Sequence, residues 1–192
     1  MSSLHEAPYV HADDRATWHA WLEANHATAR GAWLVTWRAR SSRVGLEYEA
    51  AIEEALCYGW VDSQGGRVDD ERGKLYFAPR KPRSVWAATN KARVERLIHE
   101  GRMAPAGLAA VERAKSNGSW EVLDPVERLE VPDDLAAALD RHPPAAVNFA
   151  AFPPSSRKMM LGWVAVARRS ETRAARIAKV AEAAARNELA RG

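Results

Sequence analysis

The sequence has a single cysteine, Cys57, among its 192 residues. One cysteine excludes an intrachain disulfide and any metal site built from several cysteines. No hydrophobic run approaches the ~20 residues that a membrane-spanning helix requires. The first residues also lack the apolar stretch that is typical of a secretion signal. From these absences we expect a soluble, cytoplasmic protein without a membrane span.

Familiar catalytic and nucleotide-binding motifs are missing as well. The chain has no G-x-S-x-G, no P-loop, no H-E-x-x-H, and no G-x-G-x-x-G after a predicted strand. Of the six histidines, His19 and His26 share a predicted helix face. They lie ~10 Å apart along the helix axis, which is too far for one metal ion. We therefore predict no cofactor, no metal site and no catalytic residue, and an enzyme is not the favoured interpretation.

The composition is that of a globular protein with a mildly basic surface. Hydrophobic residues make up 47% of the chain, enough for a sizeable core, and the eight tryptophans are many for this length. The net charge of +3 permits an anionic partner without requiring one. One basic loop contains Arg38, Arg40 and Arg43.

The hydrophobic periodicity divides the chain into two regions. Residues 1–83 mix helical and strand patterns, whereas residues 84–192 show helical spacing throughout. We predict an α+β fold, with a small antiparallel sheet and helices in the first region and a helical bundle in the second. We expect one integrated unit, because the helix predicted to begin at Ser84 needs the sheet to cover Trp86.

The stretch from Tyr48 to Asn90 contains most of the unusual residue choices. A helix is predicted from Tyr48 to Tyr58, and Gly59 stands where a left-handed residue ends a helix. Strands are predicted at 32–39, 60–63 and 75–77, a turn at 64–66, and a loose arm at 1–12. Cys57 is interpreted as a small buried hydrophobe, because a helix C-terminus disfavours the thiolate.

A basic loop restricted by two prolines leads into the helix predicted at Ser84. The free N–H groups of a helix start, together with forked arginine donors, favour an anion. The candidate ligand-binding residues are Trp60, Asp62, Arg80, Arg83, Trp86 and Asn90. The two tryptophans would supply stacking faces. A solvated turn with Trp86 packed inward agrees with the pattern equally well, so both interpretations stay open.

Asp62 also admits two interpretations. It precedes a glycine-rich segment, where an aspartate serves turn formation, and this structural role is favoured. It would alternatively form a salt bridge to Arg80 or Arg83, or orient a ligand. In an enzyme acting on an anionic small molecule, Asp62 would be the acid/base.

Three segments resemble one known family. They are EALCYGWVDS (54–63), YFAPRKPRSVWAATNKARVERLIHEGRMAPAG (76–107) and FPPSSRKMMLGWVAVARRSETRAARIAKV (152–180). Together they are similar to the YdeI/OmpD-associated family, also called bacteriocin-protection proteins. Departures are Glu47, where the family has Ser or Thr, and the surroundings of Asn148. The resemblance implies a link to envelope stress and to tolerance of antimicrobial peptides, and it assigns no catalytic residue.

These observations lead to a hypothesis with two alternatives. The favoured one is a non-enzymatic cytoplasmic stress-tolerance protein that binds an anionic small molecule, nucleic acid or protein partner through the basic loop. The alternatives are the enzyme with Asp62 as acid/base and a scaffold that binds only protein. A deep polar pocket at Asp62 would favour the enzyme, and a shallow basic groove would favour the binding protein.

Overall fold

The computed structural model describes residues 6–38 and 41–190. The chain divides into two compact units, one of residues 1–84 and 89–117 and the other of residues 85–88 and 118–192. Two helices beyond residue 84 thus belong to the same unit as the sheet. Whether the predicted regions 1–83 and 84–192 behave as one integrated unit stays a prediction.

The first unit contains the sheet. Its elements are β1 (Tyr9–His11), α1 (Arg15–Asn25), β2 (Ala32–Trp37), α2 (Tyr48–Cys57), β3 (Trp60–Arg67), β4 (Arg72–Pro79), α3 (Ala88–His99) and α4 (Pro105–Ser116). The strands pair in the order β1-β2-β4-β3, and only the β1–β2 pair among these is parallel. The predicted α+β class is confirmed. The sheet is mixed, because β1 forms where a loose arm was wrongly predicted.

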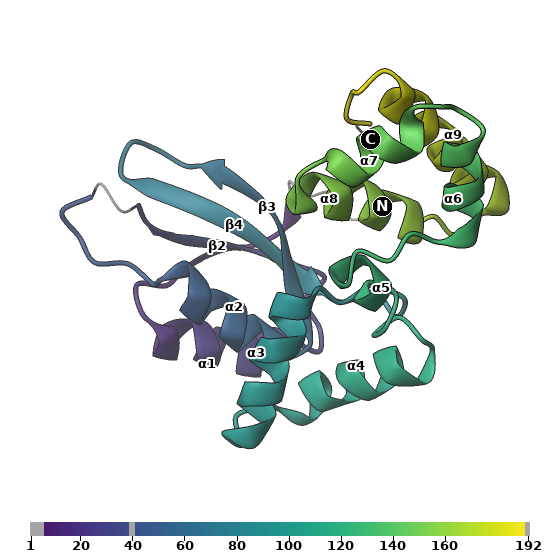
Figure 1. The fold of residues 1–192 in the computed structure, drawn as a ribbon. Coiled ribbons are helices and arrows are strands. Elements are labelled where there is room, and N and C mark those ends of the chain that lie inside the picture. Colours follow the sequence, from purple (N-terminus) through teal and green to yellow (C-terminus); the bar gives the residue numbers. More distant parts are fainter. Residues whose placement is uncertain (1–5, 39–40, 191–192) are drawn as a thin grey trace. The chain divides into compact units, whose positions relative to one another are not determined.

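Helices α1 and α2 pack against one face of this sheet (Figure 1). Trp18 of α1 is fully buried, and its ring lies 5.3 Å from the ring of Phe77 in β4. The Trp18 Nε1–H donates to the carbonyl of Ala51 in α2 at 3.1 Å. The large ring therefore fills the core and ties both helices to the sheet, while its one polar atom is satisfied.

The connection between α2 and β3 agrees with the sequence prediction. Gly59 has a φ of +72°, the left-handed conformation that ends many helices. A Cβ at this position would also lie 3.0 Å from the Cβ of Ala110 in α4. Gly59 is thus required both by its backbone and by the close approach of α4.

The β3–β4 hairpin differs from the prediction. Residues 64–66 were predicted as a turn, but they lie within β3, whose register shifts between Asp62 and Gly65. The chain reverses later, where the Asp69 carboxylate accepts the backbone N–H groups of Glu71 and Arg72 at 3.0 and 2.7 Å. The two glycines extend an irregular strand, and the aspartate forms the turn.

The start of α3 was also predicted wrongly. The helix begins at Ala88, not at Ser84, and the backbone N–H of Ser84 donates to the carbonyl of Lys81 at 2.9 Å. Pro82 and Arg83 thus form the centre of a turn, for which proline is well suited. The expected anion site at a helix start next to Arg83 is therefore absent from this described segment.

The second unit is the predicted helical bundle. Its elements are α5 (Asp124–Glu127), α6 (Asp133–Asp140), α7 (Ala145–Ala151), α8 (Pro154–Ala165) and α9 (Ser170–Ala185). α9 packs against α6, α7 and α8 around a core that includes Leu135, Phe149, Met160 and Val180. Asn148 of α7 donates to the carbonyl of Ala184 in α9 at 2.8 Å.

The described residues contain neither a membrane-spanning helix nor a group of side chains that could hold a metal ion. None of the helices found there combines the length and the apolar character needed to cross a bilayer. The same residues contain no group of three or more His, Cys, Asp or Glu side chains placed to hold a metal ion.

Candidate functional site

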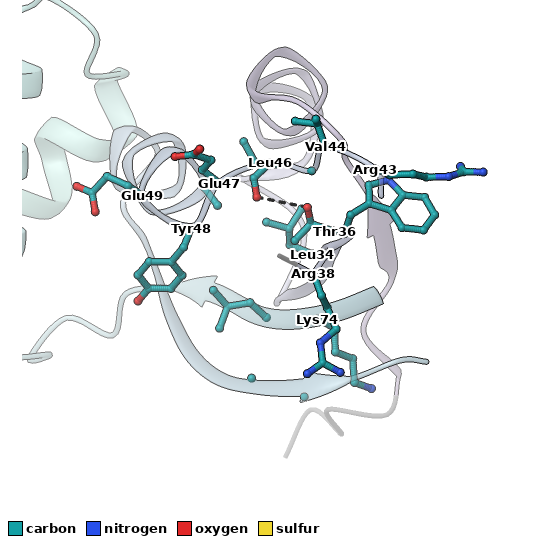
Figure 2. Close-up of a pocket in the computed structure, with 17 residues that line it drawn as sticks. Leu34, Thr36, Arg38, Arg43, Val44, Leu46, Glu47, Tyr48, Glu49 and Lys74 are labelled. Atoms are coloured by element: carbon teal, nitrogen blue, oxygen red, sulfur yellow. Dashed lines mark hydrogen bonds between the residues drawn. The ribbon is translucent and has the colours of Figure 1, made fainter. Parts of the chain in front are cut away.

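A groove of about 870 Å³ lies in the first unit, between the sheet and the segment that leads into α2 (Figure 2). Its apolar lining comes from Leu34 of β2, Leu75 of β4, Ala51 of α2 and Leu46 of the preceding loop. These side chains belong to the same sheet face and the helix that covers it. The groove therefore continues the hydrophobic core to the surface, where side chains no longer fill the space.

The loop that forms one wall is held close to β2. A Cβ on Gly45 would lie 2.5 Å from Thr36 Oγ1 and 2.8 Å from the backbone nitrogen of Trp37, so only glycine allows this approach. The Thr36 hydroxyl donates to the carbonyl of Leu46 at 3.3 Å, the contact drawn in Figure 2. The loop thereby carries its neighbours, Arg43 and Val44, to the rim of the groove.

Three glycines of the hairpin leave the strands bare where they line the groove. They are Gly65 and Gly66 of β3 and Gly73 of β4. A Cβ on Gly65 would have only the carbonyl oxygen of Lys74 nearby, at 3.7 Å, and one on Gly73 would meet nothing nearer than 3.6 Å. Gly65 pairs with Leu75 and Gly73 with Thr36, so both lie on the sheet face that lines the groove, and the absence of their side chains keeps it open. Gly66 pairs with Lys74 and faces the other side of the sheet.

The cationic side chains at the groove lie away from its acidic end. Figure 2 shows Arg38 near Lys74 and Arg43 apart from both, and all three lie away from Glu47, Tyr48 and Glu49. The Arg43 guanidinium lies 4.5 Å from the centre of the Trp37 ring, and this cation–π contact holds it in place. The Lys74 ammonium contacts the Tyr9 and Trp33 rings at 4.8 and 4.3 Å. The two arginines are thus the cations best placed to meet a ligand.

The acidic end is largely occupied by its own partners. Both carboxylate oxygens of Glu49 accept hydrogen bonds from Arg93, at 2.7 and 2.6 Å, and these bonds lower the pKa of Glu49. The Tyr48 hydroxyl donates to Asp62 at 3.1 Å, although most of its ring is exposed. Burial and the negative charge of Asp62 raise the pKa of Tyr48, so its hydroxyl remains protonated at neutral pH.

The two tryptophans of the predicted ligand-binding set are buried. Trp60 Nε1–H donates to the carbonyl of His26 at 3.4 Å, and its ring meets Trp21 edge to face. Trp86 belongs to the second unit, where its ring lies 5.0 Å from that of Trp120. Both rings serve the interior, so neither offers the exposed stacking face that we expected.

The predicted arginines have different surroundings. Arg80 is only 7% exposed, and burial lowers its pKa to about 10, an effect that the charge of Asp62 partly opposes. Arg83 is exposed on the turn described above. None of the six predicted residues lines the groove, although Asp62 reaches it through Tyr48. Their role in ligand binding stays a prediction.

Trp60, Asp62 and Asn90 are brought together around one small enclosed space beneath α2. Asn90 Oδ1 also accepts a hydrogen bond from Arg93 at 2.8 Å, the same arginine that holds Glu49. No deep polar pocket opens at Asp62 within the described residues, and this geometry does not favour the acid/base alternative.

Sequence reasoning identified the basic loop after β2 but did not connect it with a site. Arg38 and Arg43 do line the groove, whereas Arg40 lies outside the described residues. The glycines of β3 were assigned to a turn, so the groove that they open was missed. The useful signal was the combination of a glycine-rich hairpin with a basic loop on the neighbouring strand.

Two family matches cover most of the chain. Residues 10–110, more than half of the sequence, match the family described as Domain of unknown function (DUF8412). Residues 128–187 match the family described as Bacteriocin-protection, YdeI or OmpD-Associated (OmdA), which confirms the predicted resemblance for this segment. The motif at 54–63 lies within the first match. No curated protein and no solved structure matches the chain.

Proposed function

The chain belongs to the DUF8412 family, and from this premise we propose that its first unit binds an amphipathic anion in the groove next to α2. The ligand is a small molecule with an apolar body and a carboxylate or phosphate group. In this proposal the whole chain is a non-enzymatic, cytoplasmic stress-tolerance protein. The bacteriocin-protection name of the family matched by residues 128–187 supports the last part.

The observation that carries the binding proposal is the polarised lining of the groove. Leu75, Val44 and Tyr48 offer accessible apolar contact, while Arg38 and Arg43 lie away from Glu47 and Glu49. Apolar pockets with a few placed polar groups are the usual form of small-molecule sites. An apolar body gains from burial against these apolar side chains, and an anionic group gains from the arginines.

The same features favour a small molecule over nucleic acid. Proteins that bind single strands use exposed aromatic rings on which bases stack, together with a basic track along the backbone. Here Trp60 and Trp86 are buried, and the Arg43 guanidinium covers the Trp37 ring at the groove. Val44 and Tyr48 expose apolar surface at the rim, which an apolar ligand would cover.

The proposal is tested by calorimetry, in which the full chain is titrated with decanoate and, in a separate experiment, with decyl phosphate. Decyltrimethylammonium, which has the same apolar body and the opposite charge, is the control ligand. We expect the two anions to bind and the cation to bind at least about tenfold more weakly. The variant Arg43→Gln should lose about tenfold in affinity, because a hydrogen bond to a charged group contributes ~1.5–3 kcal/mol.

A second variant fills the groove without removing a charge. In Gly73→Val the nearest atom to the new Cβ is the aliphatic Cγ of Arg38 at 3.6 Å, an ordinary contact, and a β-branched residue suits a strand. We expect it to fold and to lose anion binding. Arg113→Gln and Gly162→Ala, both away from the groove, are the matched controls and should bind like the wild type. Equal affinity for the anions and the cation, or unchanged binding by Gly73→Val, would overturn the proposal.

A further inference from the structure

A second cavity in the first unit is built on two buried carboxylates. Glu53 and Glu54 are consecutive in α2, yet they are only 5% and 3% exposed. Arg15 of α1 bridges them, with Nη2 at 2.8 Å from Glu53 and Nη1 at 2.9 Å from Glu54. Arg102 bridges them from the other side, at 3.3 and 2.6 Å. The carboxylates thereby hold two guanidinium groups at the mouth of one cavity.

That cavity has a volume of about 750 Å³. It is lined by Arg15, Ala16, His19, Glu54, Gly101 and Arg102. The side chain of His19 is 45% exposed, so it meets the cavity and the solvent. Neither this cavity nor its residues belong to the groove described above.

His19 is oriented by groups on both of its ring nitrogens. Nδ1 donates to Glu54 Oε2 at 2.7 Å, and Nε2 accepts the Tyr58 hydroxyl at 3.3 Å. Burial, followed by the charges of Glu23 and Glu54, raises the pKa of Tyr58, so this hydroxyl keeps its proton as a donor. Both ring nitrogens therefore have partners within the protein, and these partners fix the ring at the edge of the cavity.

The cavity is rich in hydrogen-bond donors and poor in acceptors. Arginine has five N–H donors; among the described contacts Arg15 uses two of them and Arg102 uses three. Three donors on Arg15 and two on Arg102 remain. Glu54 offers little in return, because Oε1 already accepts from both arginines and Oε2 from His19. A ligand complementary to this arrangement supplies acceptors, as an oxyanion does.

We propose that Arg15, Arg102 and His19 form a binding site for a small oxyanion, the phosphate or carboxylate group of a ligand distinct from the one in the groove. The arginines hold the oxygens through their remaining N–H groups. His19 lines the same cavity, so its ring reports on the bound anion. This site is independent of the proposed function of the groove.

The charges around the cavity balance one another. Glu54 of α2, Tyr58 just after α2 and Arg15 of α1 surround His19, while Arg102 lines the same cavity and is paired with Glu100. With Glu53 and Arg96 included, three arginines balance three glutamates. An oxyanion is therefore held by the placed N–H donors of Arg15 and Arg102 and not by a net positive charge.

Sulfate is the probe for this site, because its charge does not change near neutral pH. The imidazole NMR signals of the full chain are followed during a sulfate titration at constant pH and ionic strength, with chloride as the balancing ion. We expect the His19 signals to move in a saturable way. His142, which belongs to the second unit and does not line this cavity, is the internal reference and should not move.

Variants assign the effect to these residues. Arg15→Gln should weaken sulfate binding about tenfold or more, and Arg113→Gln, which removes the same charge elsewhere in the unit, should leave it unchanged. If Arg15→Gln does not fold, Arg15→Lys keeps the charge beside the glutamates but not the planar fork, and it should still weaken binding several-fold.

The same titration with acetate identifies the head group, since tighter binding of sulfate assigns a phosphate ligand and tighter binding of acetate a carboxylate. If chloride shifts the His19 NMR signals as far as sulfate does, the proposed oxyanion site is wrong. So would wild-type affinity in both Arg15 variants.

Discussion

The ion pairs of Glu53 in α2 with Arg15 and Arg96 make the stability of the first unit sensitive to acid. Glu53 accepts hydrogen bonds from Arg96 at 2.5 Å and from Arg15 at 2.8 Å. Burial alone would raise the pKa of Glu53, but these hydrogen bonds and charges outweigh it and lower the pKa from 4.5 to about 2. At ~1.4 kcal/mol per pKa unit, the ionised form of Glu53 stabilises the fold by ~3 kcal/mol at neutral pH.

The perturbation that tests this is Glu53→Gln. A carboxyl whose pKa is lowered on folding contributes fully above its unfolded pKa, and the contribution disappears as the pH falls toward the folded value. We therefore expect the variant to lose ~3 kcal/mol of unfolding free energy at neutral pH and only ~1.4 kcal/mol at pH ~3. Removal of one partner from a buried pair commonly costs this much.

The assay is urea unfolding followed by tryptophan fluorescence, which reports on Trp18 and Trp60 in the core of this unit. Glu112→Gln is the control, because Glu112 is 74% exposed and pairs loosely with Lys115 at 3.6 Å; it should change stability by less than ~0.5 kcal/mol. The reasoning is refuted if Glu53→Gln is as stable as the wild type at neutral pH, or if the difference grows on acidification.

Two further predictions concern the end of α2. Gly59→Ala should destabilise the protein by more than ~1 kcal/mol in urea unfolding, because φ is +72° and the new Cβ meets Ala110. Gly65→Ala has neither constraint and should be nearly neutral. Similar stabilities of the two variants would contradict this prediction. Cys57 should react with a thiol reagent far more slowly than in urea-unfolded protein, because it is buried and burial raises its pKa to about 11. Equal labelling rates of native and unfolded protein would show that the thiol is accessible.

Local sequence patterns predicted those helices and strands whose formation depends mainly on neighbouring residues. The helix from Tyr48 and its end at Gly59 follow from apolar spacing and from a residue that adopts positive φ. Glu47 stands at the start of this helix, where the family that the sequence resembles has Ser or Thr, and its side chain makes no capping hydrogen bond. β1 was not predictable in this way, because three residues show no periodicity and their pairing with β2 is a long-range contact.

The candidate site was harder to predict, because it is assembled from separated segments. The groove needs β2, the loop around Gly45, the β3–β4 hairpin and the first turn of α2 at once. The oxyanion site was hidden for a related reason. Two adjacent glutamates on a helix are typical of a solvated face. Their burial depends on Arg15, 38 positions before Glu53, and on Arg102, 48 positions after Glu54.

Bare strands at Gly65, Gly66 and Gly73 give the groove an evolutionary property. None of the three has a positive φ, and a Cβ at any of them meets at closest a flexible lysine side chain or an ordinary contact. Single substitutions at Gly65 or Gly73 would change the depth and shape of the groove while the core, the register and the loop stay as they are. Under the proposed function, ligand preference would thus change in small steps, and each step would pass through a protein that still folds.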